Sequence, residues 1–183
     1  NGTMTIRVKY LKLDVYEETH KIERDGQLIE IVTKVYTMKI NAYKLTERGD
    51  EPLESARIHF EKDGAEIIVG DIKDGIFQYK LPASNYNIWI EYQGVKVAEK
   101  MIQHNGPTQL NIPTEVYEVS LVIIDLAENP IRGINVEFRR DNKLITSKNT
   151  DNEGKVSVTL AKGEYNVDCI LEGTKYSYSI NVD

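Results

Sequence analysis

Histidines are the side chains in this sequence best suited to bind a metal or to exchange protons near neutral pH. The chain has three of them, His20, His59 and His104, and none lies within five residues of another. Zinc sites and Ser-His or Cys-His catalysis need a histidine beside other ligands or a nucleophile. His59 stands between Ile58 and Phe60, so it is expected on the outward side of a strand. The spacing therefore predicts solvated surface histidines and no catalytic centre.

Two acidic turns resemble calcium loops: DIKDG (71–75) and DNEG (151–154). An EF-hand loop places Gly at its sixth position and Glu at its twelfth. Here Gly comes at the fifth or the fourth position, and ordinary turn chemistry explains both segments. No glycine-rich phosphate loop is present either. We therefore expect no cofactor, and calcium stays an unsupported alternative.

Trp89 is the single tryptophan. Tyr86, Ile88 and Ile90 alternate with it and are expected to point inward, so Trp89 is predicted to point outward. An exposed tryptophan can stack on a sugar ring or anchor a protein contact. The alternative, which we favour, is that residues 1–35 or a neighbouring module cover its ring.

Composition and charge exclude several classes of protein. The net charge of −6 argues against a nucleic-acid partner and against charge-driven docking on an anionic membrane. No apolar run is long enough for a membrane-spanning helix. Cys169 is the only cysteine and lies on the apolar side of an expected strand, so we predict a buried, unpaired thiol. Because the chain starts at Asn1 rather than Met, we expect either a removed leader or precursor segment, or a piece cut from a longer protein.

The elements that carry these side chains are predicted to be strands. No window of eleven residues keeps a helical pattern of apolar residues. Short alternating segments rich in Val, Ile, Tyr and Thr recur instead, separated by Gly, Asn, Asp and Pro. Eight are predicted as strands: 56–60, 66–70, 76–81, 86–92, 118–126, 134–138, 155–160 and 165–171. Strands at this close spacing predict a β-sandwich.

One stretch of sequence occurs twice. LPASNYNIWIEYQGVK (81–96) returns 79 residues later as LAKGEYNVDCILEGTK (160–175). The offset of 78 to 79 residues also relates Pro52 to Pro130 and Gly75 to Gly154. An offset held over so long a stretch indicates two copies of one module. We therefore divide the chain into an N-terminal strand or hairpin extension (1–35), a first module (36–113) and a second module (114–183).

Each repeated residue has a structural reason. The prolines pre-set φ in a turn before a strand. Gly75 and Gly154 stand where a hairpin turn needs a positive φ. Tyr86 and Tyr165 are predicted to point inward and to bond to the backbone through their hydroxyl groups.

The repeated pattern resembles two known groups. It reads x-P-[LI]-x-[SG]-[AI]-x-[IV]-x-F, a D-x-G turn, L-[PA]-x-[SG]-x-Y-x-[IV] and [YL]-x-G. It is similar to carboxypeptidase regulatory-like domains and to the B-type repeats of collagen adhesins, over residues 36–183. Both groups are prealbumin-like, seven-stranded Greek-key sandwiches. The resemblance implies an all-β chain of two tandem Greek-key, immunoglobulin-like sandwiches, and a role outside the cell, where most members are stalks, spacers and binding accessories.

Collagen-adhesin repeats often contain a Lys–Asn isopeptide bond, whose formation a buried acid promotes. The resemblance therefore implies candidate positions for such a bond in this chain. Lys44 stands near the lysine position of the first module and Asn111 in its last strand. The position of the acid holds Ile90, and its counterpart in the second module is Cys169. Without the acid, we expect no isopeptide bond.

Residues 1–35 lie outside the repeat. Residues 4–15 alternate and are predicted to form one strand, with a bulge at Tyr10-Leu11 that keeps one face apolar. A polar stretch (17–26) and a second strand (27–45) follow. The predicted interface is this apolar face together with the tryptophan: Ile6, Val8, Tyr10, Leu11, Leu13, Val15 and Trp89.

A strand with one apolar face is not stable alone. We expect residues 4–15 to act as a donor strand that completes a sandwich of a neighbouring subunit. The alternative is a hairpin within the chain, formed with residues 28–43 and with RDGQ (24–27) near its turn.

These patterns predict a non-catalytic structural protein that is secreted or displayed on the cell surface. It would be a subunit of a filament, a pilus-like fibre or a surface layer, polymerised with its own kind by β-strand addition. The alternative is a carbohydrate- or protein-binding adhesin, or an accessory module of a larger secreted protein, that binds through Trp89 and outward-facing tyrosines.

Overall fold

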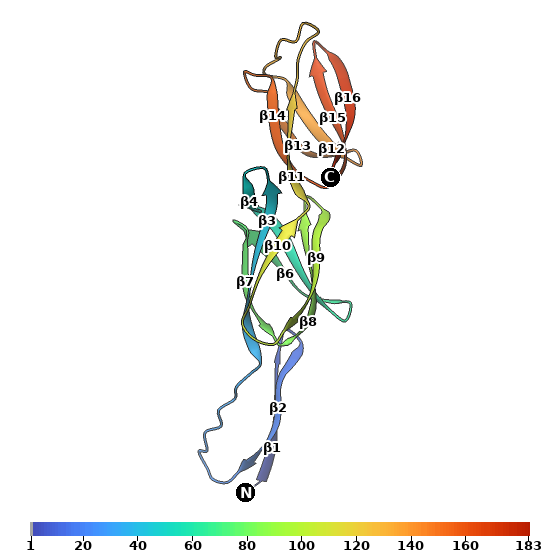
Figure 1. Cartoon of the computed structure of the whole chain (residues 1–183). Coiled ribbons are helices and arrows are strands. Elements are labelled where there is room, and N and C mark those ends of the chain that lie inside the picture. Colours follow the sequence, from blue (N-terminus) through green and yellow to red (C-terminus); the bar gives the residue numbers. More distant parts are fainter. Residues whose placement is uncertain (1) are drawn as a thin grey trace. The chain divides into compact units, whose positions relative to one another are not determined.

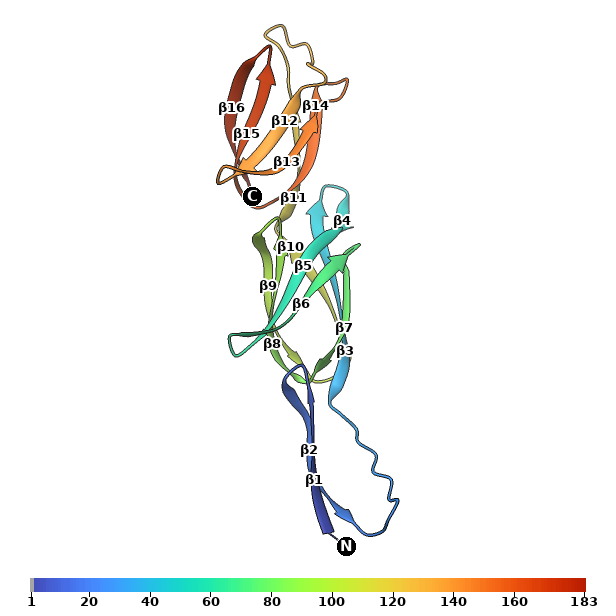
Figure 2. The same ribbon diagram turned by 180° about the vertical axis from the view of Figure 1, so that it is seen from behind.

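The computed structural model describes residues 2–183, and every regular element in that range is a β-strand (Figures 1 and 2). The predicted all-β fold class is therefore confirmed. No described residue belongs to a helix that could cross a membrane. The chain divides into two compact units: Asn1–Tyr43 with Pro52–Glu91 and Ala98–Ile112, and Lys44–Glu51 with Tyr92–Val97 and Pro113–Asp183.

Ten strands precede residue 115. They are β1 (Gly2–Tyr10), β2 (Leu13–Ile22), β3 (Val35–Thr46), β4 (Gly49–Pro52), β5 (Ser55–Lys62), β6 (Ala65–Lys73), β7 (Ile76–Pro82), β8 (Ser84–Tyr92), β9 (Val95–His104) and β10 (Thr108–Thr114). Six strands follow. They are β11 (Val116–Val122), β12 (Asn135–Arg140), β13 (Lys143–Asn149), β14 (Lys155–Ala161), β15 (Gly163–Leu171) and β16 (Thr174–Val182).

The first sandwich contains β3 to β10. Its eight strands follow the order β10-β3-β7-β6-β5-β8-β9, with β4 beside β3. A single residue pair, Lys73 opposite Ile76, joins β6 to β7, so the sheet turns a corner there and forms two layers. The inward side chains pack between the layers because strand residues alternate between faces. The largest fully buried side chains of this sandwich are Met38, Ile40, Leu53, Ile58, Phe60, Ile72, Leu81, Tyr86, Ile88 and Ile90.

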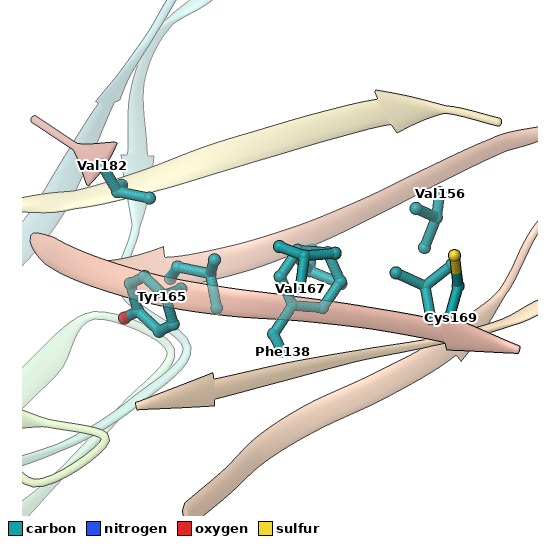
Figure 3. Close-up of a cluster of buried hydrophobic side chains, with 9 residues drawn as sticks. Phe138, Val156, Tyr165, Val167, Cys169 and Val182 are labelled. Atoms are coloured by element: carbon teal, nitrogen blue, oxygen red, sulfur yellow. The ribbon is translucent and has the colours of Figure 1, made fainter. Parts of the chain in front are cut away.

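The second sandwich contains β11 to β16. One layer is the pair β11-β14 and the other is the sheet β13-β12-β15-β16. Figure 3 shows the core between them, with Tyr165, Val167 and Cys169 of β15 pointing to the same side as Phe138 of β12. Cys169 is 7% exposed and unpaired, as predicted. Burial raises the pKa of its thiol, which makes it an inert, space-filling group.

The strand orders of the two sandwiches correspond. The pair β3-β7 matches β11-β14, and the run β6-β5-β8-β9 matches β13-β12-β15-β16. One position differs. Strand β10 lies beside β3 in the first sandwich, whereas no described strand lies beside β11 in the second.

The repeated glycines occupy equivalent turns. Gly75 and Gly154 have φ angles of +75° and +69°, as predicted. A Cβ at Gly75 would lie 2.9 Å from the carbonyl oxygen of Ala42, and one at Gly154 would lie 2.5 Å from that of Ile123. Both turns thus need glycine for its backbone angle and for the space it leaves.

The repeated tyrosines are buried and bonded as predicted. The Tyr86 hydroxyl donates to the Pro82 carbonyl at 2.9 Å, and the Tyr165 hydroxyl donates to the Ala161 carbonyl at 2.7 Å. Burial raises the pKa of Tyr86 to about 12 and also raises that of Tyr165. Each hydroxyl thus satisfies a backbone carbonyl four residues earlier in the chain.

The N-terminal residues depart from the prediction. Residues 4–15 do not form one strand, because the chain reverses at Leu11 and Lys12, whose φ angles are 50° and 64°. The shift in apolar phase at this point is a two-residue hairpin turn and not a bulge. Strand β1 therefore pairs with β2 of the same chain and not with residues 28–43. Residues 27–34, predicted to begin a strand, have no strand pairing.

Candidate functional site

The predicted N-terminal interface lies on the hairpin β1-β2. Residues directly opposite in an antiparallel pair share a face. Ile6, Val8 and Tyr10 of β1 therefore share one face with residues of β2 such as Tyr16 and Leu13. These five side chains are partly exposed, as is Leu11 at the turn, whereas Val15 is only 5% exposed.

The opposite face of the hairpin is polar. The hydroxyl groups of Thr5 and Thr19 lie 2.8 Å apart, and Arg7 pairs with Glu17 at 2.5 Å. Both partners of this ion pair are about half exposed, so the pair contributes little to the stability of the fold. The hairpin is thus amphipathic, with an apolar face that is incompletely covered.

The turn end of the hairpin is held by residues outside its two strands. The amide of Lys34 donates to the carbonyl of Val15 at 3.3 Å. Burial and a hydrogen bond with Tyr79 raise the pKa of Tyr10. The other end carries Met4, which is 47% exposed. The turn of the hairpin is therefore fixed by neighbouring groups, and near the other end the Gln27 side chain donates to the carbonyl of Lys21 at 3.2 Å.

A second candidate site is the His59–Trp89 cluster, which consists of these two residues and Glu61, Glu66 and Glu91. His59 lies directly opposite Trp89 on β5 and β8, and their rings stack 3.6 Å apart at an angle of 4°. The imidazole Nδ1 lies 3.0 Å from a Glu66 oxygen and Nε2 lies 3.8 Å from Glu91. The indole N–H of Trp89 donates to Glu61 at 2.9 Å. Three carboxylates thus surround one stacked pair of rings.

The prediction of solvated histidines is wrong for two of the three. His59 is 6% exposed because Trp89 of the adjacent strand covers its ring. His104 is fully buried between the hydroxyl of Thr108 and the carbonyl of Tyr36. Alternation along one strand indicates which face a residue occupies, but the strand beside it decides whether that face is covered.

The chemistry available to the His59–Trp89 cluster is limited. The Nε2 atom of His59 is buried and has no hydrogen-bond partner among the described residues. No group of three metal-ligating side chains occurs within residues 2–183. Trp89 points outward, as its alternation indicated, but His59 occupies one face of its indole. This arrangement is suited to holding β5 and β8 together.

The second sandwich has Asp168 at the position that corresponds to Trp89. This carboxylate is 6% exposed and accepts hydrogen bonds from Ser177 at 2.6 Å and from Lys175 at 2.9 Å. Arg139 lies 3.5 Å away. These partners, Ser177 first, hold the pKa of Asp168 below its ordinary value of 3.8. The same outer position thus holds a stacked ring, Trp89, in the first sandwich and an ion-paired carboxylate, Asp168, in the second.

The remaining candidates from the sequence have ordinary partners. Lys44 pairs with Glu51 at 3.2 Å, and Asn111 accepts a hydrogen bond from Asn41 at 2.7 Å. In the acidic turn of the second sandwich, the Asp151 carboxylate accepts the backbone amides of residues 153 and 155, each at 2.9 Å. The turn itself therefore engages one oxygen of this carboxylate, Oδ1.

One surface hollow, about 420 Å³ in volume, lies in the second sandwich. It is lined by Arg139, Asp141, Asn142, Glu164, Tyr165, Asn166, Ser179, Ile180 and Asn181. Sequence reasoning did not point to it, because its lining comes from three separate segments without any motif. The lining holds no nucleophile with an adjacent base, so the hollow offers polar contacts only.

No protein-family model matches the chain, and no curated protein matches it. Among solved structures, it is similar to the Bacillus anthracis TIE protein, with 12% identity and a TM-score of 0.36 over 97% of this chain and 36% of that one. It is similar to the shaft pilin SpaA from Lactobacillus rhamnosus GG, with 12% identity and a TM-score of 0.44 over 81% and 94% of the two chains. The minor pilin of Streptococcus agalactiae matches with 13% identity and a TM-score of 0.39 over 81% and 90%.

Two of these three structures are pilins, and the chain spans about a third of the length of the TIE protein. All three TM-scores lie below 0.5. The structural similarity is therefore too weak to indicate a function. A function has to be inferred from the contacts within this chain.

Proposed function

We propose that this protein is a non-catalytic structural subunit of an extracellular fibre or surface layer, which polymerises with its own kind by β-strand addition. The observation that carries the proposal is the amphipathic hairpin β1-β2. It is a two-stranded sheet whose strands pair only with each other and whose apolar face is partly exposed.

Each strand of the hairpin has one edge without a partner strand among the described residues. An isolated two-stranded hairpin is marginally stable in water, and three or more strands are needed for independent stability. Each edge of a sheet also presents unpaired N–H and C=O groups that can pair with another chain. Association that adds a strand to β1 or β2 would satisfy these groups and cover Ile6 and Val8.

The side chains that could take part in catalysis or ligand binding are instead used for packing and ion pairing. His59 is stacked on Trp89, His104 is bonded inside the first sandwich, and Asp168 is held by Ser177 and Lys175. Each is engaged in packing or ion pairing within its own sandwich. We further propose that the protein is secreted and displayed on the cell surface, as a fibre subunit must be.

The test is the assembly state of the whole chain, followed by light scattering and negative-stain imaging. The unaltered chain should form filaments or concentration-dependent oligomers. The double variant Ile6→Asn/Val8→Asn should weaken association by about tenfold or more, because it removes apolar contact area. The matched control Thr5→Ser/Arg7→Lys alters the polar face of the same strand and should assemble normally. Monomers of the unaltered chain at every concentration would refute the proposal.

A second candidate function is binding of a carbohydrate or protein at Trp89. Its partly exposed indole beside three carboxylates favours this reading. The stack on His59 leaves at most one ring face for a sugar. Titration of the chain with oligosaccharides, followed by tryptophan fluorescence, distinguishes the two functions. A saturable change that Trp89→Phe abolishes would support the binding role.

A further inference from the structure

The loop between β9 and β10 contains an asparagine that is followed directly by a glycine, Asn105-Gly106. Asparagine is one of the chemically labile residues, because its side-chain amide can react with the backbone of the next residue. The other Asn-Gly pair begins at Asn1, outside the described residues. Asn105-Gly106 is therefore the pair whose surroundings the structure describes.

This reaction needs an accessible asparagine and an unbonded amide on the following residue, and the loop provides both. Asn105 is exposed, and no hydrogen bond joins its side chain to another described residue. The amide of Gly106 likewise has no acceptor among the described residues. In strands and buried turns, backbone N–H groups are almost always bonded, which keeps their nitrogen from reacting. The nitrogen of Gly106 is not held in this way.

Gly106 also leaves the space around its nitrogen open. A Cβ atom at this position would meet no atom within 4 Å, and φ lies outside the left-handed region. Glycine adopts the backbone angles of ring closure more easily than any residue with a side chain. Alanine at position 106 would therefore fit the folded chain and yet hinder the reaction.

Another exposed asparagine, Asn152, shows the protected arrangement. It lies in the turn between β13 and β14, and the amide of the next residue, Glu153, donates to Oδ1 of Asp151 at 2.9 Å. The nitrogen that would attack Asn152 is thus engaged, and it belongs to a residue with a side chain. Asn152 is a comparison site of low reactivity within the same chain.

We propose that Asn105 is a site of spontaneous deamidation that slowly remodels the loop between β9 and β10. The Gly106 nitrogen attacks Cγ of Asn105, a bond forms between these atoms, and the bond from Cγ to Nδ2 breaks. The proton of the Gly106 amide leaves with Nδ2 as ammonia, and a succinimide ring remains. Solvent water then adds to one of the ring carbonyls and opens the ring. Neither step oxidises or reduces any group.

The two ring openings give different products. Opening at Cγ restores the original backbone and leaves an aspartate in place of the asparagine. Opening at the backbone carbonyl leaves an isoaspartate, in which the main chain runs through the β-carbon. Each product adds one negative charge to the loop. Isoaspartate also places one extra carbon atom in the backbone between His104 and Gly106.

Both sides of the loop are tied to the core of the first sandwich. His104 is fully buried, with Nε2 3.3 Å from the Tyr36 carbonyl and Nδ1 2.9 Å from the Thr108 hydroxyl. That hydroxyl donates to the Gly106 carbonyl at 2.8 Å. A longer backbone shifts Gly106 relative to His104 and disturbs these contacts. Because a buried polar group that loses its partner is costly, the isoaspartate form should be less stable.

Peptide mass spectrometry of the full chain tests the modification. The purified chain is kept in warm, neutral buffer for several weeks and digested at intervals. The peptide with Asn105 should gain the mass difference between an amide and an acid and separate into two isomers, while the peptide with Asn152 stays unchanged. Conversion should be severalfold slower in Gly106→Ala. An Asn105 that stays unconverted, or that converts as fast in Gly106→Ala, overturns the proposal.

Urea unfolding tests the structural consequence. Anion exchange separates the isoaspartate form from the unconverted chain, and its equilibrium constant of unfolding should be about tenfold larger. The control Asn105→Asp carries the added charge on an unaltered backbone and should unfold like the fresh chain, because residue 105 is exposed. An isoaspartate form that is as stable as Asn105→Asp overturns the proposed remodelling. These measurements on the monomer do not depend on assembly, so their failure would leave the proposed function intact.

Discussion

At the scale of single residues, Gly75 and Gly154 occupy turns that leave no room for a Cβ atom. Gly75 bonds through its carbonyl to the amide of Ala42, and Gly154 bonds in the same way to Ile123. Each glycine also packs against the proline of the preceding turn, Pro52 or Pro130. The turn, the proline and the first strand of each sandwich therefore depend on the absence of one side chain.

Replacing either glycine with alanine should lower the free energy of unfolding by about 2–3 kcal/mol. The methyl group meets a backbone oxygen that cannot move, and φ is positive at both sites. Gly94→Ala is the control, since φ is +76° there but nothing lies within 4 Å of the added atom. It should cost only about 1 kcal/mol. Urea unfolding measures all three, and equal losses would show that the close contact is not decisive.

Asp168 should make the second sandwich sensitive to acid. Its pKa is lower in the folded protein than its ordinary value of 3.8, chiefly because of the hydrogen bonds from Ser177 and Lys175. A lowered folded pKa gives stability that is present above the ordinary value and is lost as the pH falls through the folded value. Asp168→Asn should therefore be less stable than the unaltered chain at about pH 7, and this difference should shrink below the ordinary carboxyl pKa.

Urea unfolding across this pH range measures the effect. The control is Asp141→Asn, an exposed aspartate of the same sandwich, which should show little difference at either pH. A stability gap between Asp168→Asn and the unaltered chain that stays constant with pH would contradict the ion-pair explanation.

At the scale of elements, the hairpin β1-β2 depends on an unfavourable turn. A two-residue turn with positive φ at both positions favours Asn-Gly, yet the chain has Leu11 and Lys12 there. Left-handed backbone costs roughly 1–2 kcal/mol for each ordinary residue. The anchoring of Tyr10 and Val15 near the turn offsets part of this cost.

The double variant Leu11→Asn/Lys12→Gly should therefore strengthen the hairpin. We expect the amides of β1 and β2 to exchange with solvent about tenfold more slowly, as measured by hydrogen exchange of the full chain. Placing the same pair of residues at Thr3 and Thr5 should have the opposite effect, because glycine weakens a strand interior. Unchanged exchange in the turn variant would mean that the neighbouring contacts, and not the turn, hold the hairpin.

At the scale of the whole molecule, we propose that the two sandwiches are copies of one module. An experimental structure should superpose residues 50–112 on residues 128–183 with Tyr86 over Tyr165. The shared strand order and the matching tyrosine and glycine hydrogen bonds motivate this expectation. A lack of overlap at these two tyrosines would contradict it.

If each sandwich has its own core, calorimetry should resolve two unfolding transitions. Gly75→Ala should lower the midpoint of one and Gly154→Ala that of the other, by about 4–8 °C for each kcal/mol in domains of this size. A single transition that both substitutions shift equally would mean that the chain unfolds as one cooperative unit.

The local sequence determined the all-β fold class, the turns and the main inward residues. Gly75, Gly154, Tyr86 and Tyr165 behave as predicted because their roles depend on backbone angles and on groups a few residues away. Alternation assigned the faces of β8 and β15 correctly for the same reason. Such short-range constraints depend only on neighbouring residues, so they can be predicted without knowing which strands pair.

Pairing between strands was decided only by the tertiary structure. The phase shift at Leu11 fits a bulge or a turn equally well, and the partner strand settles that it is a turn. His59 is buried because Trp89, thirty residues later, lies opposite it. Each of these features depends on contacts between residues distant in the chain, which residue type and spacing along one strand do not specify.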